Sequence, residues 1–506
     1  MTVSSSRHPS LGVLSHASGG ALALVLFVAP LAYACTRPAP LHWLGMSLHL
    51  VAGLWILALL TERRRPDVPR LLLVSAAAFV VYVWARLMLG STEPLSLFTQ
   101  QHFGRIAARW PESVILRTPR AIALLWSGLT LGLVVASDLM RRSFWRRAIP
   151  ITMVTCGAVV VFIGLLQNAT RARGIYWQEP LNNMPSRFFG PFYHFTSAGA
   201  FINLTWPLAA SLALYSFRRF AVDGQPPARA VAWALVSLTI LLGHAGHVSR
   251  FPPVIAGVVL IVLFAVYHPW TSIRWSGRMA AGLAAASLLA VAGAFWTINK
   301  SGRLGEMGSR WRMLHVGSTG RPAPTPPPRT AWPDLVRDDL AIPWDQSHYF
   351  LGDRGAAYVF ACNVVLNRPL FGYGPGGWIA AVSQSAENPA VGTFYLYLQF
   401  THEDFLQTLV EWGILGATLT GVLLGGGLWT GVRRLRRDAK RPTGRPDTPA
   451  LVLGALGGLV AVLVQSLIDF PLQIPANALY ASMLLALCWS STPRRAIRES
   501  RPTTSS

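Results

Sequence analysis

The amino-acid sequence predicts an all-α polytopic membrane protein with about twelve transmembrane helices. Apolar residues make up 52% of the 506 residues and charged residues only 13%, which is too apolar for a soluble multi-domain protein. Apolar runs close to the roughly 20 residues that span a bilayer recur from end to end. Basic residues gather in alternate connections between these runs, as the positive-inside rule describes for a multi-pass protein.

The apolar runs give the order of the elements. The predicted spans are 19–35, 41–60, 71–90, 121–140, 151–168, 195–217, 231–248, 254–269, 279–298, 404–432, 451–469 and 475–490. The regions are N-terminal helices (1–150), middle helices (151–298), a large external loop (299–403), C-terminal helices (404–490) and a tail (491–506). The first run lacks a clear small-residue cleavage site and has only Arg7 as a basic flank, so we expect an uncleaved anchor.

The net charge of +23 comes from arginines in particular connections. The clusters lie at 63–70, 141–147, 218–229, 274–278, 433–445 and 494–498. All fall on one side of a twelve-span arrangement, which the positive-inside rule assigns to the cytoplasm together with both termini. We therefore expect a membrane-lipid environment and no nucleic-acid partner.

The loop 299–403 is far longer than an ordinary connection and is therefore expected to be functional or disordered. Its stretch 321–329 is rich in proline and typical of a polyproline spacer. Residues 356–366 have helical spacing and predict a helix at the interface or in the bundle. The face predicted to pack carries Tyr358, Val359, Cys362 and Val365.

A glycine-rich segment follows that helix. Gly372, Gly374 and Gly376 cannot continue a helix beside Pro375, so 372–377 is predicted to be an irregular turn. At a bilayer, irregular backbone survives only where it is buried in protein or lines a wet cavity. We expect these glycines to be structural parts of a site.

The next polar cluster is His402-Glu403-Asp404, at the start of the tenth span. Histidine titrates close to neutral pH and can act as a general base toward a hydroxyl. Acidic residues also stabilise the positive end of a helix, and without further information this structural interpretation is preferred. Asp469, at the outer end of the eleventh span, is expected to make a structural polar contact.

Three arginines fall on the external side of the twelve-span arrangement: Arg187, Arg250 and Arg354. Guanidinium groups bind phosphate oxygens through two parallel hydrogen bonds. The alternative for each is an interfacial anchor that extends toward lipid headgroups.

The cysteines and one histidine pair show no convincing metal-ligand pattern, so no metal is predicted. Cys35, Cys156, Cys362 and Cys488 lie far apart in mostly apolar sequence and are expected to pack. His244 and His247 are expected to be helix-end or pore-facing polar residues.

Five segments, in order, resemble bacterial O-antigen ligases and related polysaccharide polymerases. They are 187–192, 249–250, 369–376, 402–413 and 466–476. The resemblance covers roughly residues 150–490. It implies a GT-C-type glycosyltransferase that moves glycan from a polyprenyl-diphosphate carrier to an acceptor hydroxyl, without a metal or other cofactor. It also implies the bacterial cytoplasmic membrane, with the site facing the periplasm.

The resemblance implies Arg187 and Arg250 as diphosphate ligands, with Arg354 on the same side, and a base in the pair His402-Glu403. Which of that pair is the base stays open, because asparagine is common at position 403 in the family. Lipid A core, another glycan chain and a protein hydroxyl remain possible acceptors. The alternative function is a secondary transporter or flippase of an anionic or lipid-linked substrate, since twelve spans with broken helices and membrane arginines also suit a carrier. No internal repeat supports that alternative.

Overall fold

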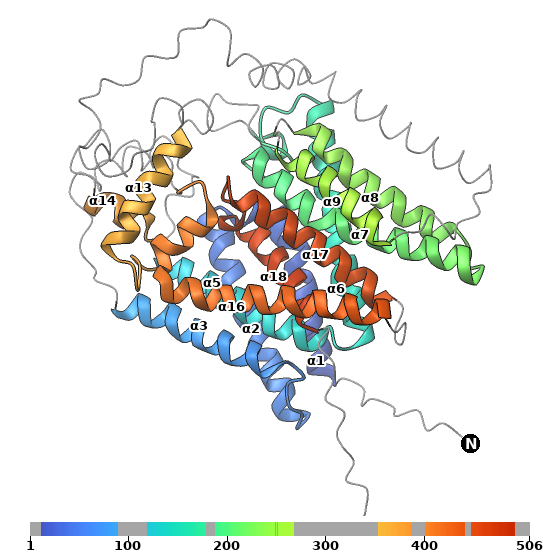
Figure 1. The fold of residues 1–506 in the computed structure, drawn as a ribbon, viewed down its shortest axis with the longest axis horizontal. Helices are drawn as coiled ribbons and strands as arrows, with labels where there is room; N and C mark the ends of the chain where they lie inside the picture. The colour runs from blue at the N-terminus through green and yellow to red at the C-terminus, as the bar shows by residue number, and fades with distance from the viewer. Residues whose placement is uncertain are drawn as a thin grey trace, which may run out of the picture.

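The computed structural model describes residues 12–89, 119–178, 188–247, 249, 251–267, 353–385, 400–440 and 447–490. These parts of the chain form helices and their connections, with no β-strand among them. Figure 1 shows a helical bundle in which α16, α17 and α18 lie between α2 and α3 on one flank and α7, α8 and α9 on the other. The prediction of an all-α protein is confirmed.

The bounds of the helices follow the apolar runs. They are α1 (Val13–Leu31), α2 (Pro38–Thr61), α3 (Arg70–Leu89), α5 (Pro119–Leu139), α6 (Ser143–Ala169), α7 (Phe195–Asp223), α8 (Ala228–Gly246), α9 (Phe251–Tyr267), α13 (Asp353–Asn367), α14 (Trp378–Ser385), α16 (Asp404–Lys440), α17 (Asp447–Ser466) and α18 (Pro475–Ser490). Short 3₁₀ turns are η1 (Tyr33–Cys35), η3 (Ile175–Trp177) and η9 (Pro471–Gln473).

Within the described residues, 9 helices are long and apolar enough to cross a membrane, and α9 contributes a shorter apolar helix. The chain is therefore a multi-pass membrane protein. Each predicted span except 279–298 coincides with a helix. Residues 279–298 and the proline-rich stretch 321–329 lie outside the described residues, as do both chain termini.

The helices α5, α7 and α17 form the centre of the bundle. In their apolar stretches 83%, 78% and 72% of the residues are buried. Small residues allow α7 and α17 to approach closely. A Cβ on Gly454 would lie 2.7 Å from the carbonyl oxygen of Pro207, and Gly458 faces the backbone of Asn203 and Leu204. Close backbone approach through small residues is the usual way that membrane helices pack, because lipid offers no hydrophobic drive between them.

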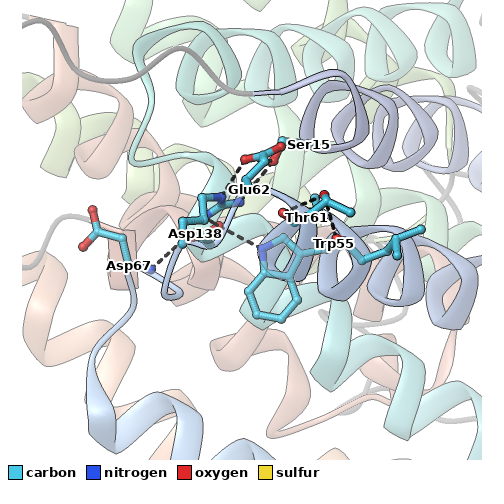
Figure 2. A network of polar contacts seen from close by, with 9 residues as sticks. Ser15, Trp55, Thr61, Glu62, Asp67 and Asp138 are labelled. Atoms are coloured by element: carbon cyan, nitrogen blue, oxygen red, sulfur yellow. Dashed lines mark hydrogen bonds and ion pairs between the residues drawn. The ribbon is translucent and has the colours of Figure 1, made fainter.

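One end of the bundle carries the turns after α2 and α5, and we call it the basic end. There the buried Asp138 accepts hydrogen bonds from Arg64 Nη1 (2.8 Å), Trp55 Nε1 (2.8 Å) and the backbone N–H of Asp67 (2.7 Å) (Figure 2). Glu62 accepts from Arg64 Nε at 3.1 Å. Ser15 of α1 donates to Glu62 Oε2 at 3.0 Å. A buried charge must be paired and hydrogen-bonded, so this network links α1, α2, the α2–α3 connection and α5.

The opposite end, which we call the site end, carries the turns 31–38, 169–178, 188–195, 400–404 and 466–475. The helix α13 lies at this end and covers the predicted helix 356–366 (Figure 1). Its predicted packing face was wrong in register. The buried residues are Ala357, Phe360, Ala361 and Val364, which pack on Trp378 and Val410. Cys362, predicted to pack, is exposed, while Val365 is partly buried against the same cluster.

Candidate functional site

The glycine-rich turn is built into a break in α16. At Gly413 the backbone has φ 61° and ψ −173°, so the helix is interrupted one residue after Trp412. Such a backbone is accessible essentially only to glycine. Gly372, Gly374 and Gly376 also have positive φ values, of 62°, 90° and 68°. Both the turn 372–377 and the break at Gly413 therefore need glycine.

The glycine-rich turn and the break in α16 satisfy each other's unpaired backbone groups. The carbonyls of Val410 and Glu411 accept from the N–H groups of Tyr373 (2.9 Å) and Gly374 (2.8 Å). On the far side of the break, Ile414 N–H donates to Pro369 (2.8 Å) and Leu415 N–H to Leu370 (3.1 Å). Buried backbone groups must be paired, so the turn replaces the missing helical bonds.

Two side chains of α3 donate hydrogen bonds to the backbone of the turn and of the break. The Tyr82 hydroxyl donates to the carbonyl of Trp412 at 2.6 Å, and Arg86 Nη2 donates to the carbonyl of Gly372 at 3.0 Å. Neither residue was predicted from the sequence. Their signal was weak, since a tyrosine and an arginine near the end of an apolar run are also typical of the membrane interface.

Glu403 caps the N-terminus of α16. Its Oε1 accepts from the backbone N–H of Phe405 at 3.2 Å, and its Oε2 accepts from that of Leu406. Burial raises the pKa of the Glu403 carboxyl, while these two hydrogen bonds act in the opposite direction. Both oxygens thus satisfy amides at the positive end of the helix.

Asp404 joins the start of α16 to the connection between α17 and α18. Its Oδ2 accepts from Ser466 Oγ (2.8 Å) and Leu472 N–H (3.0 Å), and its Oδ1 accepts from Gln473 Nε2 (3.3 Å). Asp404 is buried. Asp469 lies in the same connection and accepts from the adjacent N–H of Phe470 at 3.0 Å. One carboxylate therefore holds together two sequence segments more than sixty residues apart.

His402 is half-buried beside this joint and has an unusual backbone, with φ 59°. Left-handed backbone is uncommon for residues other than glycine, and such strain gathers at functional sites. The imidazole packs edge-on against Phe470, with ring centroids 4.8 Å apart. The Tyr358 hydroxyl donates to the His402 carbonyl at 3.1 Å. α13 thus holds the backbone of His402, and Phe470 in the α17–α18 connection packs against its ring.

The segment before α7 reaches the same place. His194 lies 6.2 Å from Phe470, measured between ring centroids. Gln465 Nε2 donates to the Thr196 carbonyl at 3.0 Å, and Asn477 Nδ2 donates to that of Ser197 at 3.1 Å. Residues 188–197, 400–404 and 466–477 therefore meet at the site end.

The predicted arginines are less fully described. Arg187 and Arg250 lie outside the described residues. Arg354 lies in the first turn of α13, at the site end; its side chain is outside the described part of the structure. Their role as diphosphate ligands stays a prediction.

The turn that precedes α9 is fixed by a buried polar chain. The N–H of Ser249 donates to Nδ1 of His247, whose Nε2 lies 2.9 Å from Nδ1 of His244. Nε2 of His244 lies 3.0 Å from Oδ1 of Asn203, and Asn203 Nδ2 donates to the Pro252 carbonyl. His244 and His247 are therefore buried helix-end residues and not pore-facing ones. They hold the backbone on both sides of position 250.

No family model and no curated protein sequence matches the chain.

Proposed function

We propose that this protein is a membrane glycosyltransferase of the O-antigen ligase or polysaccharide polymerase type. It moves glycan from a polyprenyl-diphosphate carrier to an acceptor hydroxyl. One observation supports this above the others: the described parts of all five segments that resemble that family lie at one end of the bundle. Asp404 links two of them through hydrogen bonds to Ser466 and Gln473, and the turn at Gly372 is docked on Gly413.

The proposed reaction uses His402 as the base. Its imidazole takes the proton of the acceptor hydroxyl, and the oxygen attacks the anomeric carbon of the donor sugar. The bond from that carbon to the phosphate oxygen breaks, and the electron pair leaves with the carrier diphosphate. Arg187, Arg250 and Arg354 are proposed to stabilise this leaving group, since permanently charged guanidinium groups match phosphate geometry.

Within the pair whose roles the sequence left open, the geometry favours His402. The Glu403 carboxylate is occupied by two backbone N–H groups of α16. The His402 imidazole lies against Phe470 on a strained backbone. A base must reach the proton that it removes, and a carboxylate that caps a helix is poorly placed for that purpose.

The proposed topology has the basic end in the cytoplasm and the site end on the outer face of a bacterial cytoplasmic membrane. Arginines 63–65 follow α2, and arginines 433–437 lie in the last turns of α16, away from the site end. The positive-inside rule assigns such clusters to the cytoplasm. Twelve spans, a GT-C-like arrangement and cytoplasmic termini belong to the same proposal.

The test is glycan transfer in proteoliposomes that contain the purified full-length protein, a pool of polyprenyl-diphosphate glycans and three acceptors: lipid A core, free glycan and a protein. EDTA is present throughout. We expect release of carrier diphosphate together with a longer or newly attached glycan, and loss of both in Arg187→Ala and Arg250→Ala. Labelled lipid that crosses the bilayer without any release would instead support the transporter.

A further inference from the structure

Backbone strain is concentrated at the site end. Among the described residues, non-glycine positions with positive φ are Tyr33, Ala34, Cys35, Arg63, Arg171, Tyr176, Trp177 and His402. All except Arg63 lie in turns at the site end. Each such residue costs of the order of 1–3 kcal/mol, and the surroundings must enforce it. The strain at His402 belongs to the proposed active site, but the strain in the turns η1 and η3 has no explanation yet.

The two turns interlock through tyrosine side chains. The Tyr176 hydroxyl donates to the Leu31 carbonyl, and the Tyr33 hydroxyl donates to Gln178 Oε1 at 2.9 Å. The rings of Tyr33 and Tyr176 meet edge to face at 5.4 Å. Burial raises the pKa of Tyr176 to about 12.

An arginine and a third tyrosine complete the cluster. The Arg37 guanidinium lies 3.5 Å from the centroid of the Tyr33 ring, and Arg37 Nε donates to the Tyr193 hydroxyl at 2.6 Å. Tyr33 and Tyr193 are stacked, with centroids 5.8 Å apart. Beside them Trp177 is 48% exposed, and its Nε1 donates to Thr170 Oγ1. We call Tyr33, Arg37, Tyr176, Trp177, Gln178 and Tyr193 the aromatic platform.

The aromatic platform continues toward His402. Tyr193 is followed in the chain by His194, whose ring lies 6.2 Å from Phe470. Phe470 in turn lies 4.8 Å from the His402 ring. Tyr193 of the platform is thus adjacent in sequence to His194, and the rings of His194 and His402 both contact Phe470.

We propose that the aromatic platform binds the saccharide chain of the substrate, a role that rests on the proposed transferase function. The apolar face of a sugar ring packs on tyrosine and tryptophan rings, which have an apolar body and a polar edge. Tyr33 and Tyr176 already donate their hydroxyl protons, so their oxygens can accept from sugar hydroxyls, and the amide nitrogen of the exposed Gln178 can donate to them. The platform holds the glycan while its reacting end lies at His402.

Tyrosine and tryptophan also gather at membrane interfaces in general. Residues of such a belt face lipid singly and need no particular backbone. The aromatic platform differs because its side chains come from three chain segments, hydrogen bonds join Tyr33 to Gln178 and Arg37 to Tyr193, and Tyr33, Tyr176 and Trp177 have left-handed backbone. That construction is typical of a site whose side chains must be held in fixed positions.

The test is binding of the detergent-solubilised full-length protein to a printed array of oligosaccharides cut from bacterial surface polysaccharides. The variants are Trp177→Ala and Arg37→Gln, with Trp177→Phe as the conservative change. The matched control is Trp429→Ala, which removes a tryptophan that is 60% exposed on α16. His402→Ala is included because it should stop transfer without touching the platform.

We expect the native protein, Trp429→Ala and His402→Ala to bind the same glycans. Trp177→Ala and Arg37→Gln should bind them at least tenfold more weakly, with Trp177→Phe between. In the transfer assay the platform variants should raise KM for long-glycan donors and leave kcat nearly unchanged. Native protein that binds no printed glycan, or platform variants that bind as well as native, would overturn the inference. Platform-dependent binding without any transfer would instead reject only the transferase function.

Discussion

Gly372 and Gly413 pack backbone against backbone: a Cβ built on either one would lie 2.6 Å from the backbone nitrogen of the other. Real Cβ atoms do not approach other atoms so closely. The loop before the tenth predicted span and the break inside α16 are therefore one structural unit. That unit sets the direction in which the first turns of α16, with Glu403 and Asp404, reach the site end.

The change Gly413→Ala should destabilise the protein strongly. The backbone conformation alone costs about 1–3 kcal/mol for a residue with a side chain, and the new Cβ would also meet the Leu370 carbonyl at 2.5 Å. Thermal unfolding in detergent measures the loss. Gly421→Ala in the same helix is the control, because its Cβ meets nothing within 4 Å. It should be neutral or stabilising by about 0.5–1 kcal/mol. Equal midpoints for the two variants would contradict the interlocked arrangement.

Asp404 and Ser466 should be energetically coupled. Asp404→Ala removes the acceptor of three hydrogen bonds and leaves the buried donors of Ser466 and Leu472 without it. We expect a loss of about 2–3 kcal/mol, since unsatisfied buried groups cost their full desolvation. Unfolding of Asp404→Ala, Ser466→Ala and the double variant gives the coupling, expected at about 1 kcal/mol or more. The control Thr418→Ala, on an exposed part of α16, should change the free energy of unfolding little. Additive losses for Asp404→Ala and Ser466→Ala would contradict a stabilising bond between these two residues.

The stability effect of changing the Asp138–Arg64 network should depend on whether one partner or both are removed. Asp138→Ala removes the buried carboxylate that pairs with Arg64, whose side chain is only 16% exposed, and leaves Glu62 as the other acid beside it; we expect a cost of about 3–5 kcal/mol. The double variant Asp138→Leu, Arg64→Met should recover part of that loss, because both partners of the buried pair are removed and only Glu62, 19% exposed, loses a pair. Asp223→Ala removes the exposed pair with Arg219 and should cost less than about 1 kcal/mol. A double variant less stable than Asp138→Ala would contradict this account.

Stability should fall with rising pH through the titration of Glu403. Burial raises the pKa of this carboxyl in the folded protein, so the folded state binds the proton more tightly than the unfolded chain does. The contribution is favourable below the ordinary glutamate pKa and is lost as the pH rises through the raised value. Thermal midpoints of the native protein and Glu403→Gln, taken across this interval, should differ in slope, the native protein losing more. Parallel curves would show that Glu403 does not titrate differently on folding.

The sequence predicted the fold class and the helix positions well, because apolar length and composition decide where a chain can cross a bilayer. It also predicted the irregular turn at Gly372, since no helix continues through such a segment. It could not show that Gly413 breaks α16. A single glycine in an apolar run is common in membrane helices, and only the docked turn makes this one a break.

The sequence named candidate residues for a site, but it could not give their contacts. That Glu403 caps a helix and that Asp404 bonds to Ser466 is known only from the structure, and the role of His402 stays a prediction. Arg37 and Tyr33 gave no sequence signal, because their partners Tyr193 and Gln178 are more than a hundred residues away in the chain. The packing face of α13 was predicted one residue out of register because apolar residues occur on both sides of the buried set Ala357, Phe360, Ala361 and Val364, and the sequence pattern did not separate the two faces.

The most direct test of the central claim is release of carrier diphosphate in a single turnover, measured in proteoliposomes for the native protein, His402→Ala and Glu403→Gln. The account predicts that His402→Ala lowers the rate by about 10²–10⁴, the usual contribution of a general base. Glu403→Gln should keep most of the rate and lose thermal stability. Release by His402→Ala at the native rate would contradict the account.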